Sequence, residues 1–427
     1  MTSWTTVRVG DLVAKGSAEI KTGPFGTQLK AAHYVEEGCP VINVRNVGLG
    51  GLTNAKLEHV ADDTVERLRS HLLKRGDIVF GRKAAVDRHL WVTEQEGWMQ
   101  GSDCLRLRLV SDDLDDRFAS FCLRTKQHRD WILNQSSHGS TMATLNQAII
   151  ERIEFPFPPV KTQQRIASIL GAYDDLIEVN RRRVSVLEEM ARGLFQEWFV
   201  RFQFPGHENV SILNTPDGPL PDGWEFQHIE DAFDFLGGGT PSKKIEEYWT
   251  GGTVDWYTPT DLTGSGSLFM DRSSLRITEA GLAKSSAKLF PADSIMMTSR
   301  ATLGVISICT GPASTNQGFI TCLPNERLPR TYLYHLLAQN VPIFIAHATG
   351  ATFKEITKGV FKKLKVCVPD NRVTAQFEDI ARPMHDMVLS LERSNRSLAA
   401  SRDLLLPRLI SGQLSVEAAE RQLEDAA

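Results

Sequence analysis

Residue types that could perform catalysis are present in this sequence, but their spacing matches no reactive site that we could identify. His89, Asp103 and Cys104 lie near one another along the chain and have the types of a base, an orienting carboxylate and a nucleophile. Nothing around them resembles the strand-to-turn setting that poises a nucleophile. The sequence also lacks the patterns G-x-x-x-x-G-K-[ST], H-E-x-x-H and a G-x-G-x-x-G that follows a strand. We therefore predict no catalytic residue and no metal site.

Two glycine-dense loops are candidates for phosphate binding, because amides beside glycines can approach an anion closely. Gly48-Leu-Gly-Gly51 and Gly237-Gly-Gly239 lack the lysine and hydroxyl residues that complete a phosphate loop. We interpret both as tight turns, where glycine supplies positive φ angles.

Composition is typical of a soluble, folded protein with two or three domains. The chain has 427 residues, is 41% hydrophobic and carries a net charge of −4. No apolar run reaches the roughly 18 residues of a membrane span, and the N-terminus lacks the pattern of a secretory signal, so we expect a cytoplasmic protein without a membrane partner. The six cysteines are scattered without a C-x-x-C pair, which favours free thiols. Any nucleic-acid contact would depend on local basic patches rather than on net charge.

The sequence contains an internal repeat, in which a second copy of the first half of the chain follows it. Gly139 and Gly350 occupy similar stretches 211 residues apart, and the same offset relates the sequences that follow them for some 60 residues. Upstream the offset is 217, since Ile78 aligns with Ile295. An offset this long describes a duplicated domain plus helix rather than a solenoid unit.

Each copy of the repeat consists of a globular half and a helical half. The globular halves are predicted to be mixed α/β, because short apolar runs alternate with glycine, proline and asparagine turns. The helical halves place apolar residues three or four apart over about 40 residues, as in a coiled coil. Pro383 and Pro407 are expected to kink or restart the second helix. The predicted segments are 1–157 and 221–368 (globular), 158–203 and 369–412 (helical), 204–220 (linker) and 413–427 (tail).

The helical halves carry the motifs of a known family. The run Q-Q-R-I-A-S-I-L-G-A-Y-D-D-L-I-E-V-N from Gln163 to Asn180, the run A-R-G-L-F-Q-E-W-F from Ala191, and L-L-L-P-R-L-I-S-G-Q-L from Leu404 resemble the specificity subunit of type I restriction-modification systems. Within the globular halves, Gly239-Thr-Pro-Ser242 and Ser299-Arg-Ala-Thr-Leu-Gly304 resemble the target recognition domains of that family. Lys21-Thr-Gly-Pro-Phe-Gly26 resembles another form of the same domain.

This resemblance implies an α+β architecture and a role in DNA recognition. Two similar target recognition domains would be separated by two long helices packed as an antiparallel coiled coil, with a pseudo-twofold internal repeat. Such a subunit reads a bipartite, asymmetric sequence in double-stranded DNA and has no catalysis of its own. Its partners are two modification (methyltransferase) subunits that methylate adenine, and restriction (motor and nuclease) subunits. The cofactors S-adenosylmethionine, ATP and Mg²⁺ would lie on these partners, and the cell would be bacterial or archaeal.

Loop residues with base- or phosphate-binding side chains are the predicted DNA contacts. Arginine suits guanine and asparagine suits adenine, whereas lysine, serine and threonine suit phosphate. The predicted contacts are Lys21, Arg45, Asn46, Arg82, Lys83, Arg88, His89, Thr240, Ser242, Lys243, Lys244, Ser299, Arg300 and Lys354. Each of them could instead be an ordinary surface residue. Gly139 and Gly350 are predicted to serve a turn with positive φ.

An aromatic cluster ends the first long helix. Phe195, Trp198 and Phe199 are the predicted partner-binding residues, as an anchor for a modification subunit, and the alternative is packing against the second globular half. Two further alternatives concern the whole chain. It could be a coiled-coil scaffold that binds no DNA, or the DNA-reading subunit of a related methylation-based phage-defence system.

Overall fold

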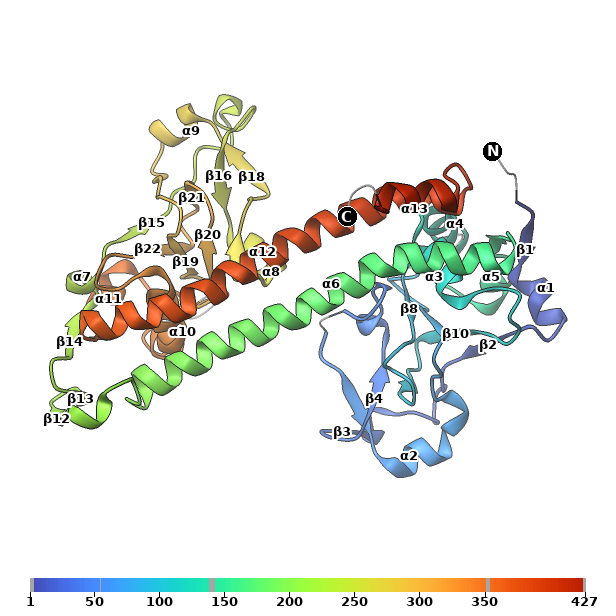
Figure 1. Cartoon of the computed structure of the whole chain (residues 1–427), viewed down its shortest axis with the longest axis horizontal. Coiled ribbons are helices and arrows are strands. Elements are labelled where there is room, and N and C mark those ends of the chain that lie inside the picture. The colour runs from blue at the N-terminus through green and yellow to red at the C-terminus, as the bar shows by residue number, and fades with distance from the viewer. Residues whose placement is uncertain (1–3, 54, 138–142, 351–353, 425–427) are drawn as a thin grey trace. The chain divides into compact units, whose positions relative to one another are not determined.

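The computed structural model describes residues 4–53, 55–137, 143–350 and 354–424 (Figure 1). These residues form two compact units. Unit 1 comprises Met1–Glu178 and Arg396–Ala427, and unit 2 comprises Val179–Asn395. Each unit therefore contains one globular half together with segments of both long helices. The consecutive segments predicted from the sequence do not match these units, because the C-terminal part of the chain completes unit 1 rather than following unit 2.

Unit 1 is built on a five-stranded sheet of order β2-β10-β7-β8-β5 and a four-stranded sheet of order β3-β6-β4-β9. A further pair, β1 with β11, joins the start of the globular half to its end. The elements are β1 Thr6–Arg8, α1 Val9–Ala14, β2 Ala18–Thr22, β3 Tyr34–Val35, β4 Cys39–Ile42, β5 Leu49–Gly50, β6 Glu58–Val60, α2 Asp62–Arg67, β7 Ile78–Gly81, β8 His89–Trp91, β9 Met99–Gln100, β10 Cys104–Leu109, α3 Asp116–Arg124, α4 Lys126–Ser136, α5 Gln147–Glu151 and β11 Glu154–Pro156.

Unit 2 repeats this topology. Its five-stranded sheet has the order β15-β22-β19-β20-β17, a three-stranded sheet has the order β18-β16-β21, and β14 pairs with β23. The elements are β12 Ile212–Thr215, β13 Gly218–Pro221, β14 Glu225–His228, α7 Ile229–Ala232, β15 Phe235–Gly237, β16 Val254–Tyr257, α8 Pro259–Ser265, β17 Phe269–Met270, β18 Leu275–Ile277, α9 Glu279–Ala283, β19 Ile295–Thr298, β20 Ile306–Cys309, β21 Ala313–Thr315, β22 Phe319–Cys322, α10 Arg330–Ala346, α11 Lys358–Phe361 and β23 Lys365–Val368.

The duplication predicted from the sequence is confirmed by the fold. In both five-stranded sheets every neighbouring pair is antiparallel except the last, since β5 runs parallel to β8 and β17 runs parallel to β20. Helices α5 and α11 begin 211 residues apart, at Gln147 and Lys358, and the predicted alignment of Ile78 with Ile295 marks the first residues of β7 and β19.

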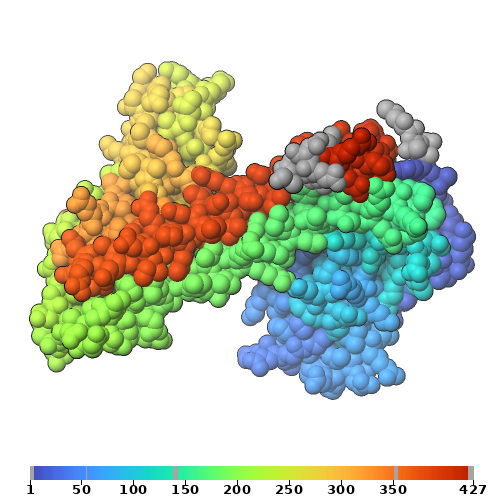
Figure 2. All heavy atoms as spheres, viewed as in Figure 1, coloured from blue at the N-terminus to red at the C-terminus, as the bar shows by residue number. Residues whose placement is uncertain are grey.

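The long helices are α6, Val160–Phe195, and α12, Asn371–Ile410. Within unit 2, α12 contributes Phe377 and Val388 to the same core as Ala191 and Phe195 of α6. The space-filling view shows the surface atoms of the two helices, green for α6 and orange-red for α12, side by side within unit 2 (Figure 2). Asn180 donates to the side-chain oxygen of Asn395 at 3.0 Å. This polar pair favours one register of the two helices, because a shift in register would leave the buried amide of Asn180 without its partner.

Three of these segments differ in detail from the sequence predictions. Pro383 and Pro407 do not restart α12, which is continuous around both. Both prolines are exposed, so water can bind the carbonyls that lose a donor. The linker 204–220 contains most of the hairpin β12–β13, and the tail 413–427 contains helix α13, Val416–Glu424. Val416 and Ala419 of α13 are buried in the core of unit 1, which is why that segment is helical.

Candidate nucleic-acid interface

A loop follows the middle strand of each five-stranded sheet, and the two loops share one backbone arrangement. In unit 1 the amide of Arg82 donates to the carbonyl of Asp103 at 2.9 Å, and the carbonyl of Arg82 accepts from the amide of Leu145 at 2.8 Å. Ser299 makes the equivalent two bonds in unit 2, at 2.8 and 3.0 Å. Since Arg82 and Ser299 are 217 residues apart, they occupy the same place in the repeat.

A second pair of equivalent loops follows β2 and β15. A Cβ atom added at Gly23 would lie 1.9 Å from the carbonyl oxygen of Gly101, and one added at Gly238 would lie 1.9 Å from that of Asn316. No side chain fits at that distance, so both loops require glycine at this point. Gly238, which was predicted to be a plain turn residue, therefore holds two loops together in unit 2, as Gly23 does in unit 1.

Positive φ angles recur at equivalent positions. Ala84 and Ala301, also 217 residues apart, have φ angles of 61° and 62°. Gly350 has a φ of 123°, which confirms the prediction of a positive φ there, and Gly139 lies outside the described residues. The two domains thus present one loop framework that differs in its side chains.

Most of the predicted DNA contacts lie on the surface. Exposed side chains belong to Arg45, Lys83, Arg88, Ser242, Lys243, Lys244, Arg300 and Lys354, and partly exposed ones to Lys21, Arg82 and Thr240. These residues therefore remain available for contact with a ligand.

Two of the exposed arginines have acidic neighbours within their own unit. Arg45 lies 2.8 Å from Glu58, and Arg300 lies 3.8 Å from Glu355. Exposed pairs of this kind contribute about 0–1 kcal/mol, so a phosphate group can replace the carboxylate at low cost.

Three predicted contacts are in the interior and cannot form part of an exposed surface. Asn46 is buried and donates to the carbonyl of Ala55 at 3.0 Å, so its amide holds a loop. His89 is buried with its Nε2 atom 2.8 Å from Ser120 Oγ, and burial lowers its pKa to about 3. Ser299 is only 3% exposed, at the start of the loop described above. Residue type suggested contact for all three, but packing from distant segments decided otherwise.

The aromatic cluster at the end of α6 is part of the core of unit 2. Phe195, Trp198 and Phe199 are 2%, 6% and 6% exposed. The ring centroid of Phe199 lies 4.7 Å from that of Tyr332 and 5.2 Å from that of Phe377. The prediction of a partner anchor was wrong, and the alternative of core packing is confirmed.

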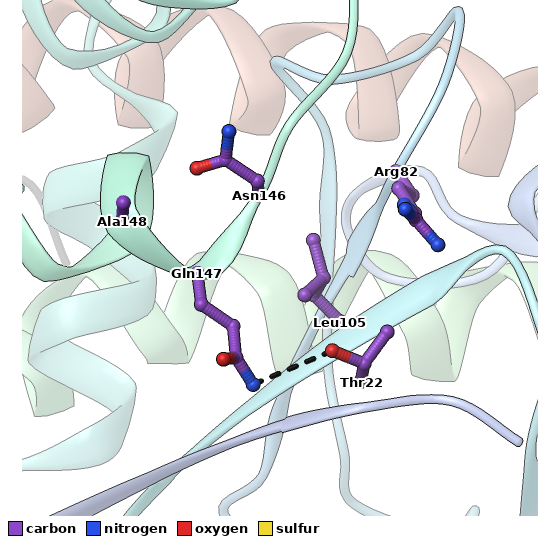
Figure 3. A pocket seen from close by; sticks show the side chains of 6 residues that line it. All are labelled: Thr22, Arg82, Leu105, Asn146, Gln147 and Ala148. Atoms are coloured by element: carbon purple, nitrogen blue, oxygen red, sulfur yellow. Dashed lines mark hydrogen bonds between the residues drawn. The ribbon is translucent and has the colours of Figure 1, made fainter.

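A surface pocket in unit 1 contains residues that sequence reasoning missed. It has a volume of about 310 Å³ and is lined by Thr22, Arg82, Leu105, Asn146, Gln147 and Ala148 (Figure 3). Asn146 caps α5 by accepting from the amide of Ile149 at 2.9 Å. Gln147, the first residue of α5, is exposed and lies 3.3 Å from Thr22 Oγ1. The sequence signal that could have found Gln147 is its place just after the repeat glycine loop.

Two histidines in unit 2 are buried, and each has a ring nitrogen without a hydrogen-bond partner among the described residues. The rings of His335 and His385 are 5.2 Å apart, and His335 Nε2 and His385 Nδ1 have no hydrogen-bond partner among the described residues. Burial, with Arg192 nearby, lowers the pKa of His335 to about 3. Burial, with His335 and Arg330 nearby, lowers the pKa of His385 to about 2.

This pair predicts an acid-sensitive unit 2. In the unfolded chain these imidazoles bind protons below about pH 6.5. In the folded chain the imidazole of His335 stays neutral until about pH 3. Stability should therefore fall as the pH drops from 6.5 to 4, by up to about 1.4 kcal/mol per pH unit for each histidine. We expect His335→Phe to flatten this decline in urea unfolding, whereas substitution of the exposed His347 by Gln should not. Equal slopes for both variants would contradict the assignment.

No helix among the described residues is long and apolar enough to cross a membrane. Within the same residues, histidine, cysteine, aspartate and glutamate form no group of three or more suited to a metal ion.

Comparison with known proteins identifies relatives over nearly the whole chain. Residues 1–189 and 221–382 match the family described as type I restriction modification DNA specificity domain. A type I restriction enzyme MjaIX specificity subunit from Methanocaldococcus jannaschii is 31% identical, over 44% of each chain. The HindI specificity subunit from Haemophilus influenzae is 23% identical, over 87% of this chain and 94% of that protein.

The fold has a solved counterpart as well. The crystal structure of a type I restriction-modification S subunit from M. genitalium superposes with a TM-score of 0.56 at 16% identity, over 95% of this chain and 96% of that one. Because the family match covers both globular halves, most of α6 and the start of α12, the chain belongs to the type I restriction-modification DNA specificity family, the DNA sequence-recognition subunits of these systems.

Proposed function

We propose that the chain reads a bipartite, asymmetric sequence in double-stranded DNA, with one recognition domain for each half. The observation that carries this proposal is the repeated loop framework with different side chains. Arg82 and Ser299 share their backbone bonds, yet one is a long cation and the other a small buried hydroxyl. Two readers with the same frame and different side chains suit two different half-sites.

The chemistry is proposed to lie on partner subunits. Two modification subunits with S-adenosylmethionine would methylate adenine, and restriction subunits using ATP and Mg²⁺ would translocate and cut. In this scheme the chain performs no catalysis and binds none of these cofactors. The proposal rests on the family to which the chain belongs.

Expression of the chain with its cognate modification subunit in a methylation-deficient host would test this function. We expect sequencing of modified bases to find one bipartite motif with methylated adenine. Omission of the chain should abolish this methylation. Methylation without the chain, or at a motif that lacks two parts, would overturn the proposal. A gel shift with the assembled complex would separate this function from a scaffold that binds no DNA, and restriction of unmethylated phage would separate it from a methylation-only system.

A single substitution distinguishes base contact from phosphate contact in the first domain. If Arg82 reads a base edge, Arg82→Ala should weaken binding of the cognate sequence by about 1–3 kcal/mol and relax one position of one half-site. If it contacts phosphate, binding should weaken equally for all sequences and the dependence on salt should decrease. Titrations of cognate and scrambled duplexes at several salt concentrations would decide. Lys126→Ala, which removes an exposed charge of α4, is the matched control.

A further inference from the structure

The pocket beside α5 has a counterpart at the same place in unit 2, with different side chains. The offset of 211 that relates α5 to α11 places Gln147 at Lys358. In both units the preceding residue caps the helix, since Asn146 accepts from the amide of Ile149 and Thr357 accepts from that of Val360. The cap thus preserves the same local backbone, while the residue after it changes from an amide to an ammonium group.

Each of these side chains reaches the end of the equivalent strand in its own unit. Gln147 Nε2 lies 3.3 Å from Thr22 Oγ1, where β2 ends. In unit 2 the Lys358 side chain lies over Gly237, where β15 ends, because a Cβ atom added there would be 2.7 Å from Lys358 Nζ. Gln147 and Lys358 are both exposed. Because the two residues occupy equivalent positions on the same local backbone, the units differ here in the side chain rather than in the fold.

The opposite side of the pocket in unit 1 carries a second group suited to a base. The guanidinium of Arg82 lies 5.0 Å from the ring centroid of Phe25, which is 51% exposed. Figure 3 shows Gln147 and Arg82 on opposite sides of Leu105, with the Gln147 amide directed toward Thr22. Gln147 is exposed and Arg82 is partly exposed. The amide of Gln147 makes only long contacts, 3.3 and 3.4 Å, so a ligand can replace them at little cost.

We infer that Gln147 reads an adenine in the half-site of the first domain, and that Lys358 reads a guanine at the equivalent position in the half-site of the second. A glutamine side chain can donate to N7-side acceptors and accept from the N6 amino group of adenine, whereas lysine is a donor only and matches O6 and N7 of guanine. Arg82, across the pocket, contacts the same base pair or its neighbour. This inference rests on the proposed function, because it assigns specificity residues to the two recognition domains.

Exchange of the two side chains tests the inference in the assembled complex. Gln147→Lys should change one position of the first half-site from adenine to guanine, with the preference for the former base reduced roughly tenfold to a hundredfold. Lys358→Gln should produce the opposite change, in the second half-site only. Gln147→Ala should relax the same position without creating a new preference. Gln127→Ala, on the exposed side of α4, is the control and should leave the motif unaltered.

The measured quantity is the methylated motif of each variant in a library that randomises both half-sites, with thermal unfolding to verify that each variant is folded. An unaltered motif in both exchange variants would overturn the inference. A uniform loss of methylation across all sequences would also overturn it, since that result identifies a phosphate contact. If the wild-type complex itself methylates no bipartite motif, the proposed function fails. That result is separate from the failure of this inference, which requires a wild-type motif that the variants leave unaltered.

Discussion

Replacement of residues 1–157 by the first globular half of a relative is expected to change one half of the methylated sequence and to leave the other half unaltered. The reason is that unit 2 keeps its own sheets, loops and core when the substitution is confined to unit 1. Sequencing of modified bases in cells that express the chimera with the modification subunit would provide the measurement. A change in both half-sites would contradict two independent readers.

The structure defines what such a chimera must preserve. Asp174 of α6 binds Arg124 of α3 and Arg402 of α12, each at 2.5 Å. Arg117 binds Asp175 at 2.5 Å. A donor domain without arginines at the positions of Arg117 and Arg124 would remove the partner of the exposed Asp175 and one of the two partners of the partly buried Asp174. The matched control is a donor that has both arginines, and the reciprocal chimera of residues 221–368 should alter only the other half-site.

Truncation of Phe199 is expected to destabilise unit 2 by about 3–5 kcal/mol, as for other buried aromatic side chains. Its ring contacts those of Tyr332 and Phe377, and it lies 5.8 Å from that of Trp224. Phe199→Ala would leave a cavity among these rings. Urea unfolding followed by tryptophan fluorescence would measure the effect. Val200→Ala, one residue further along and 40% exposed, should cost less than about 1 kcal/mol.

The outcome also separates the two roles considered for this cluster. A partner anchor on the surface would lose affinity for the modification subunit without losing stability. Truncation of a core residue instead lowers the stability of unit 2, and assembly fails only to the extent that unit 2 unfolds. Unaltered unfolding together with impaired assembly would contradict the core role.

Prediction from sequence succeeded where the signal is local or repeated. The offset of 211 predicted that Gln147 and Lys358 occupy equivalent places, and helices α5 and α11 begin there. The short apolar runs from which mixed α/β halves were predicted include those that form β7 and β19. Such signals survive without tertiary information, because alternating or helical spacing of apolar residues already specifies the backbone that can bury them.

Prediction failed where a side chain's surroundings come from remote parts of the chain. His89 has the type of a phosphate or base contact, but Ser120, 31 residues away, covers it. The tail 413–427 has no apolar run that requires a helix, but α13 forms because Val416 and Ala419 pack into unit 1. Arg165 of α6 also binds Glu417 and Glu420 of α13, at 2.7 and 2.6 Å. These contacts join residues more than 250 positions apart in the chain, so no local sequence pattern could predict them.

The sequence by itself determined the duplication, the order of globular and helical segments and the family, because all three depend on which residues follow one another. The tertiary structure alone decided that Arg396–Ala427 completes unit 1, that Phe195, Trp198 and Phe199 belong to the core, and that Gln147 lies beside Thr22 at a pocket. Exposure decides which polar side chains can meet a ligand. Exposure is a property of segments that are distant in the sequence and adjacent only after folding, so residue type and spacing cannot supply it.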